Sequence, residues 1–368
     1  MKQLFGTDGI RGVAGQYPLD HATVFAAGRA LGELVAKLHA KPAVLIGIDT
    51  RQSGLGIAQR LAAGLELAGV PACFAGVITT PAIAHLTQHG RFVAGVMISA
   101  SHNPYQDNGI KVFAHSGFKL PDEQEHEVEQ GIARLRGGPG ELSALIPDPS
   151  LARTYIEHLA ACVERPLRAD LRLTIDCANG AAFRIAPRLF RRLRLRAQFI
   201  GDQPNGRNIN LQCGSLHLAA LRAAVLESKS DLGVAFDGDA DRALFISGTG
   251  REIDGDAVLW MAARHFRVPL VVTTTMANLG LQKALEREDI AVVRTPVGDK
   301  YVLEEMLRRK AELGGEQSGH IIFRRWATTG DGLLTALKVL EILAATGRTL
   351  DELTAGLPVY PQIIRSVP

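Results

Sequence analysis

The sequence predicts an α/β protein of three consecutive, similar α/β domains, with mixed, mostly parallel sheets around a shared cleft. Short apolar runs alternate with segments of helical periodicity, which is the pattern of βα units. The order strand, polar loop, helix recurs three times at intervals of roughly 100 residues, as expected for repeated domains. The length of 368 residues also favours more than one hydrophobic core.

The first predicted unit starts with a strand at residues 43–48, followed by a polar loop and a helix with apolar residues such as Leu61 and Leu65. A second strand, at residues 93–99, runs directly into a polar turn. Both predicted strands therefore end in polar residues.

Two later segments repeat this order. Residues 171–176 lead through a polar turn into a helix that begins near Ala181, and residues 270–273 lead through residues 276–280 into another helix. In open α/β sheets, ligands bind beyond the carboxyl ends of the strands. The polar loops of the three units are therefore expected to face one common cleft.

Segments rich in Gly, Pro and Ser predict the domain boundaries. The first boundary is expected within residues 136–149 and the second near residues 247–250. The predicted domains are residues 1–147, 148–248 and 249–368.

Composition and charge exclude several classes of protein. The net charge is only +3 and the basic residues are dispersed, so no nucleic-acid partner is expected. The densest basic stretch, residues 184–196, is interleaved with apolar residues and predicts the solvated face of an amphipathic helix. No apolar run suits a signal peptide or a membrane helix, so we expect a cytoplasmic protein without a membrane partner. The four cysteines are widely spaced, which indicates free thiols and supports neither a disulfide framework nor a zinc site.

A metal site is predicted where Asp237, Asp239 and Asp241 follow an apolar run. Three carboxylates at alternate positions of a turn can converge on one hard cation, and oxygen ligands favour magnesium or calcium. A calcium-binding EF-hand loop would require a glycine at its sixth position and a glutamate at its twelfth, where this chain has Arg242 and Gly248. An EF-hand is therefore excluded.

The turn Ser-Ala-Ser-His-Asn-Pro at residues 99–104 offers a hydroxyl at the end of a strand. Ser101 is the candidate to carry a phosphate there, although an ordinary serine-rich turn has the same local pattern. A seryl–histidine hydrolase is disfavoured because no G-x-S-x-G surrounds Ser99 or Ser101. Lys111 leads the next apolar run and could point into the cleft, neutralise phosphate and shuttle a proton.

Two further segments offer polar groups to a ligand. Glu316, Ser318 and His320 alternate in a glycine-flanked loop and suit the hydroxyl or amino groups of a sugar. Arg11, in the glycine-punctuated segment 5–12, could reach a phosphate.

Together these segments resemble the α-D-phosphohexomutase superfamily. Residues 5–12, 99–104, 237–242 and 315–320 occur in the order and at the spacing of that superfamily, and residues 328–332 resemble the segment after its sugar loop. The resemblance covers essentially the whole chain.

The resemblance implies a phosphoserine mechanism. Ser101 would be the phosphoserine and would hold Mg²⁺ together with Asp237, Asp239 and Asp241. The other implied roles are those of the phosphate contacts Arg11 and Arg242, the general acid/base Lys111, and the sugar-binding residues Glu316, Ser318 and His320.

The implied reaction moves a phosphoryl group between the 6- and 1-positions of a hexosamine phosphate through a hexose 1,6-bisphosphate. Gln317 and the wording of residues 5–12 favour glucosamine phosphate, with mannose or glucose phosphate as the alternative. The resemblance leaves room for a homodimer. A magnesium-dependent phosphatase is the third alternative, and the sugar loop argues against it.

Relatives in the superfamily carry a fourth domain whose Arg-x-Ser-Gly-Thr loop grips the non-reacting phosphate. No such loop follows Pro361 in this sequence. We therefore expect the fourth domain to be absent from this chain and activity to be impaired, and a non-catalytic phosphosugar-binding role stays as a rival.

Overall fold

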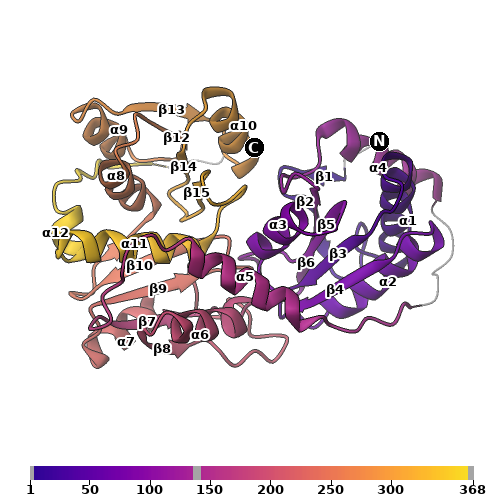
Figure 1. Cartoon of the computed structure of the whole chain (residues 1–368), viewed down its shortest axis with the longest axis horizontal. Helices are drawn as coiled ribbons and strands as arrows, with labels where there is room; N and C mark the ends of the chain where they lie inside the picture. Colours follow the sequence, from indigo (N-terminus) through magenta and orange to yellow (C-terminus); the bar gives the residue numbers. More distant parts are fainter. Residues whose placement is uncertain (1–3, 136–141, 364–368) are drawn as a thin grey trace.

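The computed structural model describes residues 4–135 and 142–363. It contains three sheets, each with its own helices, which we call the first, second and third units. In Figure 1 the first unit lies on the right, and the second and third units lie on the left, one above the other.

The first unit has a six-stranded sheet in the order β1-β2-β6-β5-β3-β4. Its strands are β1 Phe5–Gly6, β2 Gly9–Val13, β3 Val44–Ile48, β4 Ala72–Val77, β5 Ala94–Ile98 and β6 Asp107–Ala114. Its helices are α1 His21–Leu38, α2 Gly54–Leu67, α3 Thr80–His89 and α4 Asp122–Leu135. Side chains alternate across the sheet, so Val44 and Ile46 share a core with α1, α2 and α4 while Leu45 packs with α3.

The second unit has a five-stranded sheet in the order β11-β10-β9-β7-β8. Its strands are β7 Arg172–Asp176, β8 Arg196–Ile200, β9 Leu232–Phe236, β10 Ala243–Ser247 and β11 Glu252–Ile253, and its helices are α5 Pro149–Ala161, α6 Ala182–Arg192 and α7 Ala219–Ser228. The amphipathic-helix prediction for the basic stretch is confirmed for residues 184–192, because the arginines of α6 are exposed while Ile185 and Leu189 are buried. It is wrong for the end of the stretch, since Arg194 lies in a turn and Arg196 begins β8. Residues 247–250 join β10 to β11 within this sheet.

The third unit has a four-stranded sheet in the order β13-β12-β14-β15. Its strands are β12 Leu270–Thr274, β13 Ala291–Thr295, β14 Leu313–Gly315 and β15 Ile321–Phe323, and its helices are α8 Gly255–Phe266, α9 Leu279–Glu286, α10 Asp299–Arg309, α11 Gly332–Thr346 and α12 Leu350–Thr354. Helix α11 lies between the second and third units (Figure 1) and contacts β9, β10 and α8. One apolar core therefore runs from α3 and α5 through the second unit into the third.

The prediction of three α/β units with mixed sheets is confirmed, but the sheets are not mostly parallel. Among the described strands, six of the twelve strand pairs are parallel, and they form the centre of each sheet. The other six are antiparallel. The reason is that each unit ends its parallel core in a hairpin, β5–β6, β9–β10 or β14–β15, whose short connection can only join antiparallel strands.

These three hairpins occupy the same place in the three sheets. In each hairpin the first strand pairs in parallel with a core strand, which is β3, β7 or β12. The second strand is antiparallel to the first. Their connecting loops are residues 99–106, 237–242 and 316–320, which contain the serine, aspartate and sugar motifs. The fold thus presents the three motifs from equivalent positions.

Within the described parts of the chain, no helix has both the length and the apolar composition needed to cross a membrane.

Candidate active site

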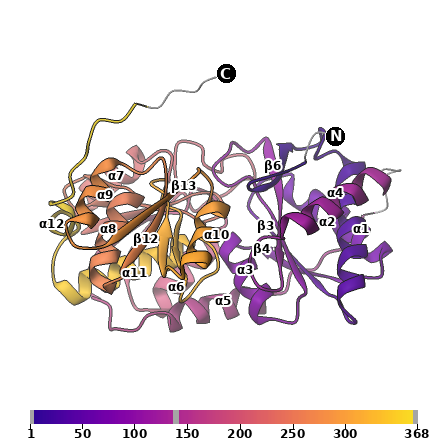
Figure 2. The same ribbon diagram turned by 90° about the horizontal axis from the view of Figure 1, so that it is seen from above.

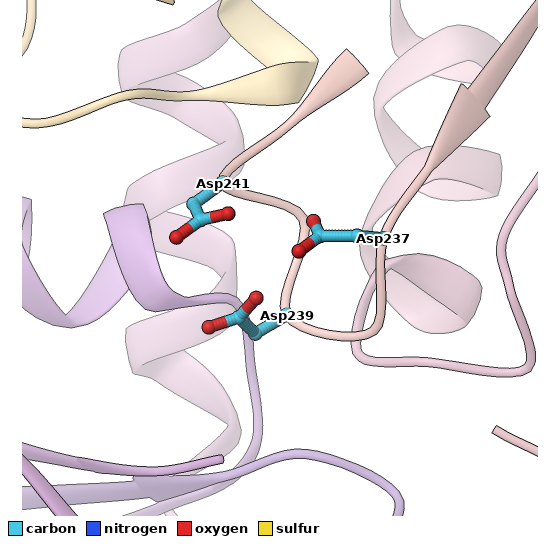
Figure 3. Close-up of side chains that lie close together, drawn as sticks. All are labelled: Asp237, Asp239 and Asp241. Atoms are coloured by element: carbon cyan, nitrogen blue, oxygen red, sulfur yellow. The ribbon is translucent and has the colours of Figure 1, made fainter. Parts of the chain in front are cut away.

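The carboxylate triad Asp237, Asp239 and Asp241 occupies the loop between β9 and β10. The three residues are no more than 5% exposed, and one oxygen of each lies within 4.8 Å of the others. Figure 3 shows the three carboxylates turned toward a common space inside the loop. The Oδ1 atoms of Asp239 and Asp241 are buried without any hydrogen-bond partner, although buried polar atoms normally have one. The donor set and these unpartnered oxygens fit a hard divalent cation.

The charges in the triad are unequal. Burial, together with repulsion from Asp241 and Asp239, raises the pKa of Asp237 well above its usual value. Burial also disfavours the charged form of Asp241, but attraction to Lys111 and contact with His320 outweigh this effect and lower its pKa well below the usual value. A cation in the triad would favour the ionised form of all three carboxylates.

Ser101 lies directly against the triad. Its Oγ donates a hydrogen bond of 2.5 Å to Asp237 Oδ2, and the residue is 1% exposed. Its φ of 50° is in the left-handed region, which costs energy for a residue with a Cβ and is tolerated where contacts fix the backbone. The fold therefore aims this hydroxyl at the carboxylates.

A buried ion pair fixes the serine loop. Ser101 N–H donates to Ser99 Oγ (2.9 Å), and Ser99 Oγ donates to Asp49 Oδ2 (2.7 Å). Asp49 also pairs with Arg51 Nε at 2.8 Å, and both side chains are fully buried. Arg51 Nη2 in turn donates to the carbonyl oxygens of Ser101 and Asn103, each at 2.8 Å.

The second unit supports the same loop through Asn210, whose Nδ2 donates to Ser101 O at 2.9 Å. Close approach is possible because residue 238 is glycine, since a Cβ there would lie 2.5 Å from Ser101 O. Asp49, Arg51 and Asn210 are not among the site residues predicted from the sequence. The available signal for the first two is their position directly after a buried strand.

Lys111, on β6, reaches the triad from the first unit. Its Nζ lies 3.0 Å from Asp239, 3.2 Å from Asp8 and 3.4 Å from Asp241, and the side chain is 1% exposed. Burial alone would lower its pKa, but attraction to the three carboxylates outweighs burial and raises the pKa well above its usual value. Lys111 is therefore an ammonium ion in this arrangement.

Two arginines lie near the serine loop, where burial and the charges of both arginines lower the pKa of His102. Arg11 pairs with Asp8, and its Nη1 donates to Ala100 O at 3.4 Å. Arg242 Nε lies 3.9 Å from Asp241 Oδ1. The Nε atoms of both arginines are buried without a hydrogen-bond partner, so each retains an unused donor.

The loop of residues 316–320, which we call the sugar loop, contains side chains with different contacts. His320 is 2% exposed, and its Nδ1 lies 3.7 Å from Asp241 Oδ2. Glu316 accepts from Gly298 N–H at 3.2 Å and from the Ser318 hydroxyl at 3.3 Å. The amide of Gln317 donates to Asp254 at 3.2 Å, so this side chain holds the loop to the start of α8.

Further residues that the sequence analysis does not assign tie the units together here. Lys119 Nζ lies 2.8 Å from Asp8 and 2.7 Å from Asp299, which begins α10. In Figure 2, α10 lies on the side of the third unit that faces the first. The hydroxyl of Thr80, the first residue of α3, donates to Asp239 at 2.5 Å. The structure thus brings Ser101, Lys111, Arg242 and His320 to the triad, with residues from all three units around it. Glu316 lies near enough for its charge to act on Arg242, and Ser318 contacts Glu316.

Three protein-family profiles match the chain. They are phosphoglucomutase/phosphomannomutase alpha/beta/alpha domain I over residues 2–137, domain II over residues 153–250 and domain III over residues 254–360.

Individual proteins show the same similarity. A curated phosphoglucosamine mutase from Solibacter usitatus is 56% identical over 376 residues, which cover 100% of this chain and 84% of that protein. Another from Koribacter versatilis is 51% identical over 383 residues, which cover 100% of this chain and 83% of that protein. A solved phosphoglucomutase/phosphomannomutase family protein from Burkholderia thailandensis matches with a TM-score of 0.84 at 28% identity, covering 97% of this chain and 80% of the other.

Proposed function

This chain belongs to the phosphoglucomutase/phosphomannomutase family, and we propose that it is a phosphoglucosamine mutase, an enzyme that interconverts glucosamine 6-phosphate and glucosamine 1-phosphate. Two relatives that match it over 100% of its length and are more than 50% identical have that name, which favours glucosamine phosphate over mannose or glucose phosphate. The observation that carries the mechanism is the 2.5 Å contact between Ser101 Oγ and Asp237 Oδ2. It puts a hydroxyl that can accept a phosphoryl group beside three carboxylates suited to a divalent cation.

The proposed reaction has two matching half-reactions. In the first, the O–P bond of phosphorylated Ser101 breaks while an O–P bond forms to the free hydroxyl of glucosamine 6-phosphate. The sugar hydroxyl loses a proton and Ser101 Oγ gains one, and the product is glucosamine 1,6-bisphosphate. The bisphosphate then reorients in the cleft and transfers its 6-phosphate to Ser101. This second transfer releases glucosamine 1-phosphate.

Magnesium is the cation that we propose for the triad. Asp237, Asp239 and Asp241 would hold it, with a phosphate oxygen on Ser101 as a further ligand, because magnesium prefers carboxylate and phosphate oxygens. When bound, it would neutralise charge on the phosphoryl oxygens.

The surrounding cations have complementary tasks in this proposal. Lys111, as a buried ammonium ion, neutralises a phosphoryl oxygen and acts as general acid and base. It donates the proton that the departing Ser101 oxygen gains, and the resulting amine takes up the proton that the sugar hydroxyl loses. Arg11 and Arg242 bind phosphate through their unpartnered donors. His320 stays with Asp241, while Glu316 and Ser318 bind sugar hydroxyl or amino groups.

Two finer points accompany this proposal. The four cysteines are free thiols, which supports a reducing cytoplasmic location. A homodimer stays a prediction.

Substrate choice tests the proposal. The protein is supplied with magnesium and a hexose 1,6-bisphosphate, and glucosamine 1-phosphate and mannose 1-phosphate are offered in parallel. We expect a higher kcat/KM for glucosamine 1-phosphate. A clear preference for mannose 1-phosphate would assign the chain to the other branch of the family, and release of inorganic phosphate alone would make it a phosphatase.

A further inference from the structure

A second group of metal-binding side chains lies away from the carboxylate triad, where α3 packs against α5. Each helix contributes two of them at a spacing of four residues: His85 and His89 on α3, and His158 and Cys162 on α5 and its carboxyl cap. The ring centroids of His85 and His89 are 4.4 Å apart, and those of His85 and His158 are 3.7 Å apart. Cys162 Sγ lies 3.6 Å from His158 Nε2. We call these four residues the imidazole cluster.

We propose that the imidazole cluster is a second metal site, which binds a divalent transition metal of the zinc class through three imidazoles and the Cys162 thiolate. Two histidines four residues apart on one helix face form a chelating pair for zinc. Nitrogen and sulfur donors suit zinc, whereas the all-oxygen triad suits magnesium. The two sites of the molecule would therefore select different metals by donor type.

The hydrogen bonding of His89 favours this role. His89 Nδ1 lies 3.1 Å from the carbonyl oxygen of His85, which can only accept, so His89 donates from Nδ1 and keeps Nε2 free. Donation of the second ring nitrogen to a backbone carbonyl is a common feature of zinc-binding histidines.

Metal binding requires two local changes. Among the described residues only the carboxylate triad already has its donor atoms gathered, because His85 and His158 stack with ring planes 19° apart. Rotation of these rings about their Cβ–Cγ bonds would aim their nitrogens at a shared ion. The metal would displace the thiol proton of Cys162 to solvent as the sulfur–metal bond forms.

Such an ion would link the first and second units. Helix α3 begins at Thr80, whose N–H donates to Asp239 O at 3.0 Å, and it ends at His89. The triad therefore contacts the first residue of α3 through Asp239, and His85 lies about 7.5 Å from Thr80 along the helix axis. A metal held between α3 and α5 should stabilise the packing that also positions the triad.

Metal stoichiometry and cobalt spectroscopy test the proposal on the full chain. The protein is dialysed against zinc in excess magnesium, which competes for the triad, and bound zinc is measured by elemental analysis. We expect one bound zinc per chain, loss of that zinc in the double variant His85→Gln/His158→Gln, and retention in His217→Gln, an exposed histidine elsewhere. Equal zinc content in the double variant and the wild type would overturn the proposal.

Cobalt substitution identifies the ligands by a signal that carboxylates cannot produce. We expect a thiolate-to-cobalt charge-transfer band that disappears in Cys162→Ser. Absence of this band in the wild type would overturn the assignment of Cys162. Thermal melting of the metal-free variants shows whether they fold, and the cobalt spectrum of Cys162→Ser stands as an independent test if the double variant does not.

Discussion

Arg51 Nη2 lies 2.8 Å from the carbonyl oxygen of Ser101, so a fully buried guanidinium holds the loop that presents the candidate phosphoserine. The same side chain also donates to the carbonyl oxygens of Asn103 and Asp107. The serine loop is therefore fixed by a fully buried ion pair. Removal of either partner of such a pair leaves an uncompensated buried charge.

We predict that Arg51→Met lowers the free energy of unfolding by about 3–5 kcal/mol, because Asp49 would remain buried and unpaired. Denaturant unfolding measures this change. The control is Arg222→Met, which removes an exposed pair with Glu252 and should cost less than about 1 kcal/mol. Equal costs for the two variants would show that Arg51 does not brace the serine loop.

Gly238→Ala should lower kcat at least about tenfold while the protein remains folded. The added Cβ would lie 2.5 Å from Ser101 O, so the aspartate and serine loops must move apart, and small displacements of reacting groups are costly. The matched control is Gly56→Ala in α2, where the nearest atom is the end of the Arg60 side chain at 3.8 Å. The account of the two loops fails if Gly238→Ala has wild-type turnover.

Lys111→Met should make stability depend more strongly on magnesium. Without Lys111, the carboxylates of Asp8, Asp239 and Asp241 lose the cation that lies within 3.4 Å of each. We expect Tm to fall in metal-free buffer and to recover in part when magnesium is added, with no such recovery in the exposed control Lys37→Met. An equal loss of Tm with and without magnesium would show that the lysine and the cation do not share the task of neutralisation.

Asp256 should make stability fall as the pH rises. Burial raises its pKa to about 7, so between about pH 4 and pH 7 the folded protein holds a proton that the unfolded chain has lost. The contribution of Asp256 is therefore largest below pH 4 and decreases toward pH 7, by at most about 1.4 kcal/mol per pH unit. Asp256→Asn should remove this part of the pH dependence, so its stability relative to wild type should increase from pH 5 to pH 8. A difference that stays constant with pH would contradict the raised pKa.

The positions of the motifs can be predicted from sequence because each follows an apolar strand. Asp237 follows β9 directly and Ser101 follows β5 within three residues, so strand periodicity alone places both residues at the carboxyl ends of strands. Strand direction is not encoded in that periodicity, which is why the antiparallel partners β6, β10 and β15 are not predicted.

Residues that act through long-range contacts are also beyond sequence analysis of one chain. Arg51 reaches Ser101 across 50 positions, and its own surroundings read as a solvated loop. The imidazole cluster illustrates the same limit. The spacing of the cysteines along the chain predicts no zinc site. The cluster could not be found in this way, because His85 and His158 come from helices that meet only in the folded protein.

Phosphate transfer to Ser101 is the most direct test of the proposed function. The protein is incubated with magnesium and a hexose 1,6-bisphosphate, and the intact mass and modified peptide are determined for the wild type, Ser101→Ala and Ser99→Ala. We predict one phosphate per chain on the peptide containing Ser101, abolished in Ser101→Ala and largely retained in Ser99→Ala, because only the Ser101 hydroxyl contacts Asp237 while Ser99 donates to Asp49. Phosphate incorporation that persists in Ser101→Ala would contradict the account.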